Sequence, residues 1–99
     1  MQIDIRSVHF KTDKKLDDFI EEKVAKLAQY YDGVIGSEVS LKVANAESAE
    51  NKITEIRLSI PGNDLYAKKQ SKSFEEATDE ACDALRRQLV KHKEKQRKN

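Results

Sequence analysis

Hydrophobic and polar residues alternate in four segments of the chain, a two-residue period typical of β-strands with one buried face. The first two segments are residues 1–7 and 39–44. The third covers 55–60 and ends at Pro61-Gly62-Asn63-Asp64, which favours a turn because proline and glycine supply special backbone angles. The fourth, 65–70, is shorter and more polar, as expected of a strand at the edge of a sheet.

A helical period replaces the alternation from about Lys14 to Tyr31, after an N-cap at Thr12-Asp13. We expect Asp32-Gly33 to end this helix, because glycine accepts the left-handed geometry at a helix C-terminus. One face of the helix is apolar and comprises Leu16, Phe19, Ile20, Val24, Leu27 and Tyr31.

A second helix begins at the capping box Ser73-Phe74-Glu75-Glu76. In this motif the serine and the glutamate three residues later each bind the other's free backbone amide. After about Lys93 nothing apolar follows, so we expect the end to fray. The residues predicted to be buried by this helix are Phe74, Ala77, Ala81, Leu85 and Leu89.

The element order is therefore βαβββα, with a polar loop at 45–51. A strand–helix–strand opening requires a right-handed crossover and a parallel first pair, and an antiparallel meander then follows. Each helix has one apolar stripe, so both should cover the same face of a four-stranded mixed sheet. The 99 residues thus predict a single α+β domain, 1–99.

Composition supports a folded protein with a densely charged surface, since charged and hydrophobic residues each make up 37% of the chain. No apolar run approaches the ~20 residues that span a bilayer, and the N-terminus does not resemble a signal peptide. The single cysteine, Cys82, excludes an internal disulfide and fits a reducing cytoplasm. A buried thiol on the second helix is a better interpretation of Cys82 than a catalytic one.

The net charge of +1 hides a segregation along the second helix. Its first half, 75–83, carries only acidic charges, and its second half, 86–98, is basic apart from Glu94. Compensation of the helix dipole explains only the charges of the terminal turns. The basic residues form two rows, which fit a phosphate backbone, although a solubilising surface is an equally good explanation of the rows alone. One row is Arg87, Lys91, Lys95 and Lys98, and the other is Arg86, Lys93 and Arg97.

Two lysines of the first helix are placed unusually for a solvated surface. Lys23 falls between Phe19 and Leu27, inside the apolar stripe, and Lys26 lies beside the stripe's edge. A lysine can extend out of such a position, which is the competing explanation. The functional interpretation is that the stripe borders a cleft where phosphates dock, with Tyr30 as a further contact.

The face of the sheet opposite the helices should be polar and should lack the aromatic pairs that stack single-stranded bases. This pattern favours recognition of backbone shape over recognition of splayed bases. The residues expected on that face are Gln2, Asp4, Arg6, Ser40, Lys42, Glu55, Arg57, Tyr66 and Lys68.

Patterns typical of catalysis are missing. No cysteine or histidine cluster has metal-ligand spacing, and no nucleophile has a visible base nearby in the sequence. The only histidines are His9 and His92, and His92 falls on the apolar stripe of the second helix, as a packing or RNA-contact residue. We therefore predict a non-enzymatic protein with no cofactor, no metal and no small-molecule substrate.

The chain resembles the bacterial ribosome hibernation-promoting factors and the related ribosome-associated inhibitor A over almost its whole length. The resemblance lies in three segments, of which the strand Leu41-Lys42-Val43 is the shortest. Residues 23–32, KVAKLAQYYD, are similar to the family's K-x-A-K-L-x-Q-Y-aromatic-D helix. Residues 87–95, RQLVKHKEK, are similar to the R-Q-L-x-K-H-K-x-K end of its last helix. Together, in this order and spacing, these segments are highly specific.

This resemblance implies a fold like that of double-stranded-RNA-binding domains. It also implies a cytoplasmic protein of stress and stationary phase that binds ribosomal RNA of the small subunit in the messenger and transfer RNA channel, inhibiting translation by steric occlusion. A second hibernation factor could take part in ribosome pairing. The expected RNA-binding residues are Lys23, Lys26, Lys42, Arg86, Arg87, Lys91, Lys93 and Lys95.

The chain also departs from the family pattern. Ala84 stands where relatives often carry a lysine, and Arg86 is extra and could compensate. The second helix keeps its serine cap but lacks the tyrosine common in relatives. The chain stops soon after the basic helix, which favours the short hibernation-promoting type. The alternative function is a protein-interaction module that modulates a transcription factor, with the basic helix recognising an acidic protein surface.

Overall fold

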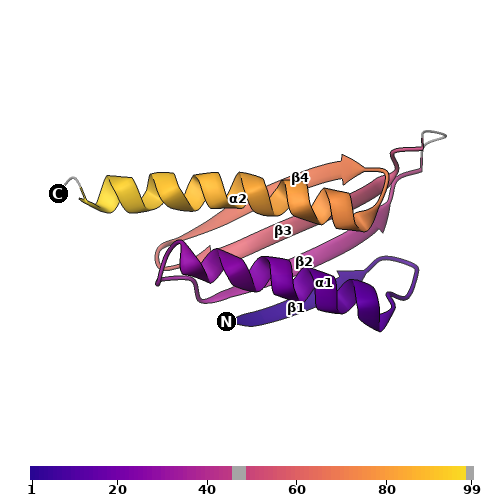
Figure 1. The fold of residues 1–99 in the computed structure, drawn as a ribbon, viewed down its shortest axis with the longest axis horizontal. Coiled ribbons are helices and arrows are strands. Elements are labelled where there is room, and N and C mark those ends of the chain that lie inside the picture. The colour runs from indigo at the N-terminus through magenta and orange to yellow at the C-terminus, as the bar shows by residue number, and fades with distance from the viewer. Residues whose placement is uncertain (46–48, 98–99) are drawn as a thin grey trace.

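A four-stranded sheet carries two helices on one face (Figure 1). The computed structural model describes residues 1–45 and 49–97, the last two of these by their backbone alone. The predicted α+β class and βαβββα order are confirmed, with one additional 3-10 turn, η1. The elements are β1 (Gln2–Ser7), α1 (Lys14–Ala25), η1 (Lys26–Gln29), β2 (Gly36–Val43), β3 (Lys52–Ile60), β4 (Asn63–Ser71) and α2 (Phe74–Arg97).

The strands lie in the order β1-β2-β3-β4, so β1 and β4 form the edges of the sheet. β1 pairs with β2 in parallel through the α1 crossover, with Ile5 opposite Val39, and the other two pairs are antiparallel. The parallel first pair, the meander and the edge position of the fourth strand are as predicted. Part of the expected loop 45–51 lies outside the described residues.

The hairpin between β3 and β4 is tighter than predicted. Only Pro61 and Gly62 form its turn, and Gly62 has a φ of 78°, which favours glycine. Asn63 and Asp64, which we assigned to the turn, instead pair with Ile60 and Ser59 as the first residues of β4. Cross-strand pairing thus adds two polar residues to the start of β4, where the hydrophobic alternation does not predict a strand.

The core lies between the sheet and the two helices, and alternate residues of the three later strands point into it. β1 is an edge strand, so its Ile3 and Ile5 are only partly buried. Sheet and helices therefore enclose one common core. Its fully buried large apolar side chains are Ile20, Val24, Val39, Leu41, Ile56, Leu58, Leu85 and Leu89.

The first helix ends differently from our prediction. Its last turn tightens into η1, and Tyr30 follows with a right-handed backbone. Gly33 does not adopt the left-handed geometry, so that prediction was wrong. A Cβ at Gly33 would lie 2.5 Å from the ring of Tyr31, so this glycine makes room for an aromatic side chain.

α2 begins as predicted, because the amide of Glu76 donates to Oγ of Ser73 at 3.1 Å. The helix runs on through Arg97, beyond the point near Lys93 where we expected fraying. Lysine, glutamate, glutamine and arginine are good helix formers, which accounts for a continuous helix without apolar contacts. Its C-terminal turns extend past the end of the sheet (Figure 1).

Candidate nucleic-acid interface

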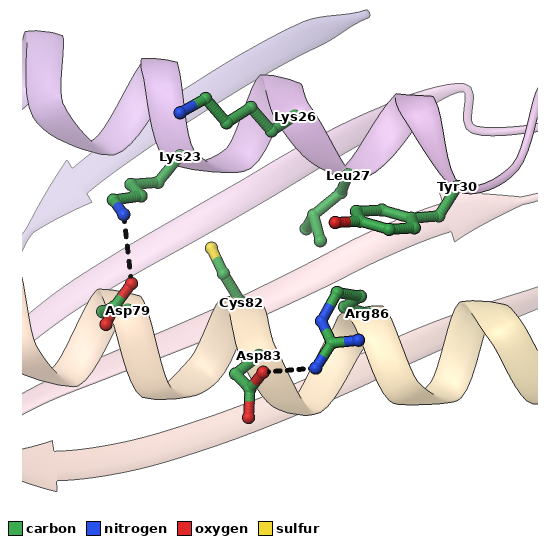
Figure 2. Close-up of a pocket in the computed structure, with 8 residues that line it drawn as sticks. All are labelled: Lys23, Lys26, Leu27, Tyr30, Asp79, Cys82, Asp83 and Arg86. Carbon is green, nitrogen blue, oxygen red and sulfur yellow. Dashed lines mark hydrogen bonds and ion pairs between the residues drawn. The ribbon is translucent and has the colours of Figure 1, made fainter.

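A cleft of about 150 Å³ lies between the two helices on the face away from the sheet (Figure 2). Its presence beside the apolar stripe of the first helix agrees with the prediction made from Lys23 and Lys26. Four lining residues come from α1, η1 and Tyr30 just after them, and the other four come from α2. The lining residues are Lys23, Lys26, Leu27, Tyr30, Asp79, Cys82, Asp83 and Arg86.

Lys23 crosses the cleft from α1 to α2. Its Nζ lies 3.2 Å from Oδ1 of Asp79 and 5.6 Å from the centre of the Phe19 ring. The side chain is only 36% exposed. The lysine thus extends along the apolar stripe and places its charge at the cleft. Both sequence interpretations of Lys23, a lysine that extends out of the stripe and a stripe that borders a cleft, therefore describe it.

Asp83 holds two cations of α2 at once (Figure 2 shows one of the pairs). Nη2 of Arg86 donates to Oδ1 of Asp83 at 2.8 Å, and Nη1 of Arg87 lies 3.0 Å from Oδ2. The hydrogen bond from Arg86, with the positive charge of both arginines, lowers the pKa of Asp83 below its ordinary value. Asp83 is therefore ionised and bound to two of the expected RNA-binding residues.

Asp79 and Asp83 are the part of the site that our sequence interpretation missed, since it gave the acidic half of α2 no role in the site. The signal for Asp83 was present, because residues three and four positions apart face each other on a helix. Nothing in the sequence pairs Lys23 with Asp79, because that contact depends on how the two helices pack.

Cys82 lies at the floor of the cleft and is 7% exposed. Burial, with the nearby charge of Asp79, raises the pKa of its thiol to about 12. The group is thus a neutral packing residue at physiological pH, which confirms the interpretation of Cys82 as a buried helical thiol.

Described members of the two basic rows lie on different sides of α2, although Arg86 and Arg87, one from each row, share Asp83. Arg86 faces α1 across the cleft, whereas Lys91 and Lys95 line a groove beside the start of β4. Ala84 is partly buried against the core, about 200° around the helix from Arg86. Arg86 therefore lies on a different side of the helix from the position of the lysine absent at Ala84.

The lysines near the end of α2 differ from the cations of the cleft. Lys91, Lys93 and Lys95 are exposed, and none of them forms an ion pair with any residue that the structure describes. Lys26 falls between these two groups of cations, because its ion pair with Glu22 is a long one of 3.8 Å. The side chain of Arg97 and all of Lys98, which we included in the rows, lie outside the described residues.

Lys42 is separated from the other candidate residues. It is exposed on β2 and alternates with the buried Leu41, so it lies on the face of the sheet opposite the helices. On that open face Tyr66 donates to Glu55 at 3.1 Å, and Lys68 lies 3.7 Å from the same carboxylate. The open face is polar, as its alternation predicted, and the structure adds that these three residues are paired with one another.

The ring of His92 packs edge-on against Tyr31, with 5.0 Å between ring centres. This contact agrees with the packing interpretation of His92. Among residues 1–45 and 49–97, no group of three or more metal-ligating side chains is close enough to hold an ion. Within the same ranges no helix is long and apolar enough to cross a membrane.

Comparison with known proteins identifies the family. Residues 3–97 match the model of the family described as "Sigma 54 modulation protein / S30EA ribosomal protein". The chain belongs to this family. It is 35% identical to the ribosome hibernation promoting factor of Pseudomonas putida over 96 residues, 97% of this chain and 90% of that protein. It is 32% identical to the factor of the same name from Escherichia coli K12 over 95 residues, 96% of each chain.

Two solved structures share the fold. The N-terminal domain of Protein Y from Thermus thermophilus aligns with a TM-score of 0.80 at 24% identity, over 93% of this chain and 99% of that domain. A ribosomal subunit interface protein from Coxiella burnetii aligns with a TM-score of 0.82 at 19% identity, over 94% and 98% of the two chains. Membership of this family confirms the resemblance read from the sequence and the prediction of a non-enzymatic protein.

Proposed function

We propose that this protein is a ribosome hibernation factor that binds the small ribosomal subunit in the messenger and transfer RNA channel. The names of its relatives and its family membership support a role in ribosome hibernation. The observation that carries the binding surface is the exposed set Lys91, Lys93 and Lys95 on α2, next to a cleft bordered by further cations. Inhibition is steric, because a folded domain in the channel excludes messenger and transfer RNA.

Several properties of this surface suit the phosphate backbone of folded ribosomal RNA. Helices hold the cations at fixed spacing, so little flexibility is lost on binding, and each neutralised phosphate releases counterions. The open face of the sheet is less suited to splayed bases, because its Tyr66 is engaged with Glu55. The proposed ligand is therefore the shape and charge of the RNA backbone.

On this proposal the protein acts with the cytoplasmic ribosome in stationary phase and stress, and a second hibernation factor joins in where ribosomes pair. The expected contacts are Lys23, Lys26, Arg86, Arg87, Lys91, Lys93 and Lys95 on the helical face. Lys42 would contact RNA only if the subunit also reaches the opposite face of the sheet.

A second candidate function is modulation of a transcription factor, which the words "Sigma 54 modulation protein" in the family's description favour. The same basic turns of α2 would then bind an acidic protein surface. The two functions differ in the ligand that is bound, a small ribosomal subunit in one case and an acidic protein in the other.

The testing experiment is co-sedimentation of the purified protein with small ribosomal subunits across a salt series, with messenger and transfer RNA as competitors. We expect saturable binding at about one copy per subunit, steep dependence on salt and loss of binding with either competitor. Absence of binding near physiological salt would overturn the ribosomal proposal and favour the protein-interaction module.

A further inference from the structure

On the helical face, the cations of the expected interface other than Lys26 fall into two electrostatic classes. Lys23 and Arg86 line the cleft, and Arg87 shares Asp83 with Arg86; these three residues, called the cleft cations below, are engaged by Asp79 or Asp83 at 2.8–3.2 Å (Figure 2 shows two of these three pairs). Lys91, Lys93 and Lys95, one to three turns further along α2, have no such partner among the described residues. A polyanion thus meets free charges at the end of the helix and occupied charges in the cleft.

We infer that Asp79 and Asp83 are specificity-determining residues that keep the cleft cations from binding polyanions of the wrong shape. This inference rests on the proposed function, in which folded RNA is the ligand. The carboxylates act as built-in competitors, because a phosphate must replace them at Lys23, Arg86 and Arg87 before it is bound.

The strength of these ion pairs makes replacement of the carboxylates by phosphates selective. An exposed ion pair is weak, so a carboxylate can be displaced, but each displacement reduces affinity by about 1.5- to 5-fold. A rigid RNA that presents several phosphates to the cleft at once compensates for these losses together. A flexible single strand must also lose conformational freedom to do so, and it therefore binds the free lysines alone.

The floor of the cleft supports this assignment. Cys82 and Leu27 are buried there and carry no charge at neutral pH, so they offer a phosphate no attraction of their own. The charge state of the cleft is therefore governed by its cations and the carboxylates that hold them. Asp79 and Asp83 are themselves exposed enough to move aside, with side chains 65% and 47% exposed.

The test compares the wild type with Asp79→Asn/Asp83→Asn in binding to poly(U), a flexible single strand, across a salt series. The variant frees Lys23, Arg86 and Arg87, and each added phosphate contact on a single strand contributes about 0.7 to the log–log salt slope. We expect the slope to steepen by up to about 2, with affinity at low salt rising about tenfold. Asp79→Asn alone should give about half the steepening of Asp83→Asn alone, because it frees one cation instead of two.

The matched control is Glu75→Gln/Glu76→Gln, which changes the net charge of α2 by the same amount. Both glutamates are exposed and form no ion pair with a described residue, and glutamine retains the capping box at Glu76. We expect its poly(U) slope to equal that of the wild type. Equal slopes for the wild type and the aspartate variant would overturn the inference, and so would equal steepening in the control. Failure of both proteins to bind poly(U) at low salt would overturn it as well.

Small ribosomal subunits provide the second arm. There the cleft cations are already engaged in the wild-type complex, so the aspartate variant should bind several-fold more tightly with an unchanged slope. The ratio of subunit to poly(U) affinity should therefore fall. If the wild type does not bind subunits, the proposed function fails, while the poly(U) arm still decides whether the carboxylates restrict the cleft.

Discussion

At the scale of single residues, a buried pair of hydroxyls joins the sheet to α2. The oxygens of Thr54 on β3 and Thr78 on α2 lie 3.2 Å apart, and both residues are 0% exposed. No other hydrogen bond of either side chain is found among the described residues. Thr78→Val leaves the hydroxyl of Thr54 without a partner, and we expect it to reduce the free energy of unfolding by about 1–3 kcal/mol.

The double variant Thr54→Val/Thr78→Val distinguishes this mechanism from a simple change of packing. Replacing both partners by groups of similar shape removes the unsatisfied hydroxyl, so the double variant should be closer to wild-type stability than Thr78→Val. Urea unfolding of the four proteins in a double-mutant cycle measures the coupling. Simple addition of the two single effects would contradict a coupled pair.

The raised pKa of the Cys82 thiol predicts that the stability of the fold depends on pH. Its pKa of about 12 in the folded protein lies above its ordinary value of 9.0, so folding disfavours the thiolate. The resulting stability is fully present below about pH 9 and is lost as pH rises towards 12. We expect Ellman's reagent to label the native protein slowly at pH 8 and the urea-unfolded protein rapidly.

Cys82→Ala is the control for the linkage. Its unfolding free energy should fall less between pH 8 and 10.5 than that of the wild type, because other titrating groups are shared by both proteins. Equal pH dependence of the two proteins, measured by urea titration, would show that the thiol does not contribute.

Residue chemistry also shows where prediction from the sequence ended. The burial of Cys82, the position of Lys23 at a cleft and the packing of His92 follow from their places on helical stripes. The pairing of Lys23 with Asp79 depends on the distance between two helices, which no local pattern encodes. Gly33 shows the same limit, since its role depends on the ring of Tyr31 and not on its own backbone angle.

At the scale of elements, alternation and helical period located every strand and both main helices, but not their ends. β2 and β3 begin several residues earlier than predicted, because pairing of Gly36 with Ser59 and of Lys52 with Ser71 extends them. In β3 the added residues include Ile53 and Thr54, which are both buried and interrupt the alternation. The last turn of the first helix tightens to η1 although its residues keep the helical period. Backbone hydrogen bonding determines where such elements end, and the hydrophobic pattern indicates these ends only in part.

We expect different roles for two lysines that lie on opposite sides of the sheet. Lys91→Ala on α2 should weaken binding to small ribosomal subunits and flatten the log–log salt slope by about 0.7–0.9, the contribution of one phosphate. Lys42→Ala removes the same charge from the opposite face, and we expect an unchanged slope. Co-sedimentation in a salt series measures both. Equal flattening by Lys42→Ala would show that the subunit surrounds the protein, and an unchanged slope for Lys91→Ala would exclude it as a phosphate contact.

At the scale of the whole molecule, α2 divides into a folding half and a binding half. Up to Leu89 its apolar side chains are buried against the sheet, and His92 makes the last aromatic contact. The turns beyond carry the exposed Lys93 and Lys95, and the end of the helix extends past the sheet (Figure 1). Because these turns bury no core residue, the helix can present charge there without weakening the fold.

Truncation after His92 tests this division. The shortened chain keeps the described core, so we expect its midpoint of thermal unfolding to shift by no more than a few degrees. It loses Lys93 and Lys95 together with the basic residues that follow, and its salt slope for small ribosomal subunits should flatten by about 2 or more. Lys93→Gln/Lys95→Gln in the full-length chain removes the two charges while leaving the helix intact, and it should reproduce about 1.4–1.8 of that change. Unaltered subunit binding by the truncated chain would place the interface on the cleft and on the retained part of α2 with Lys91, whereas a large loss of stability would show that the last turns of α2 also support the fold.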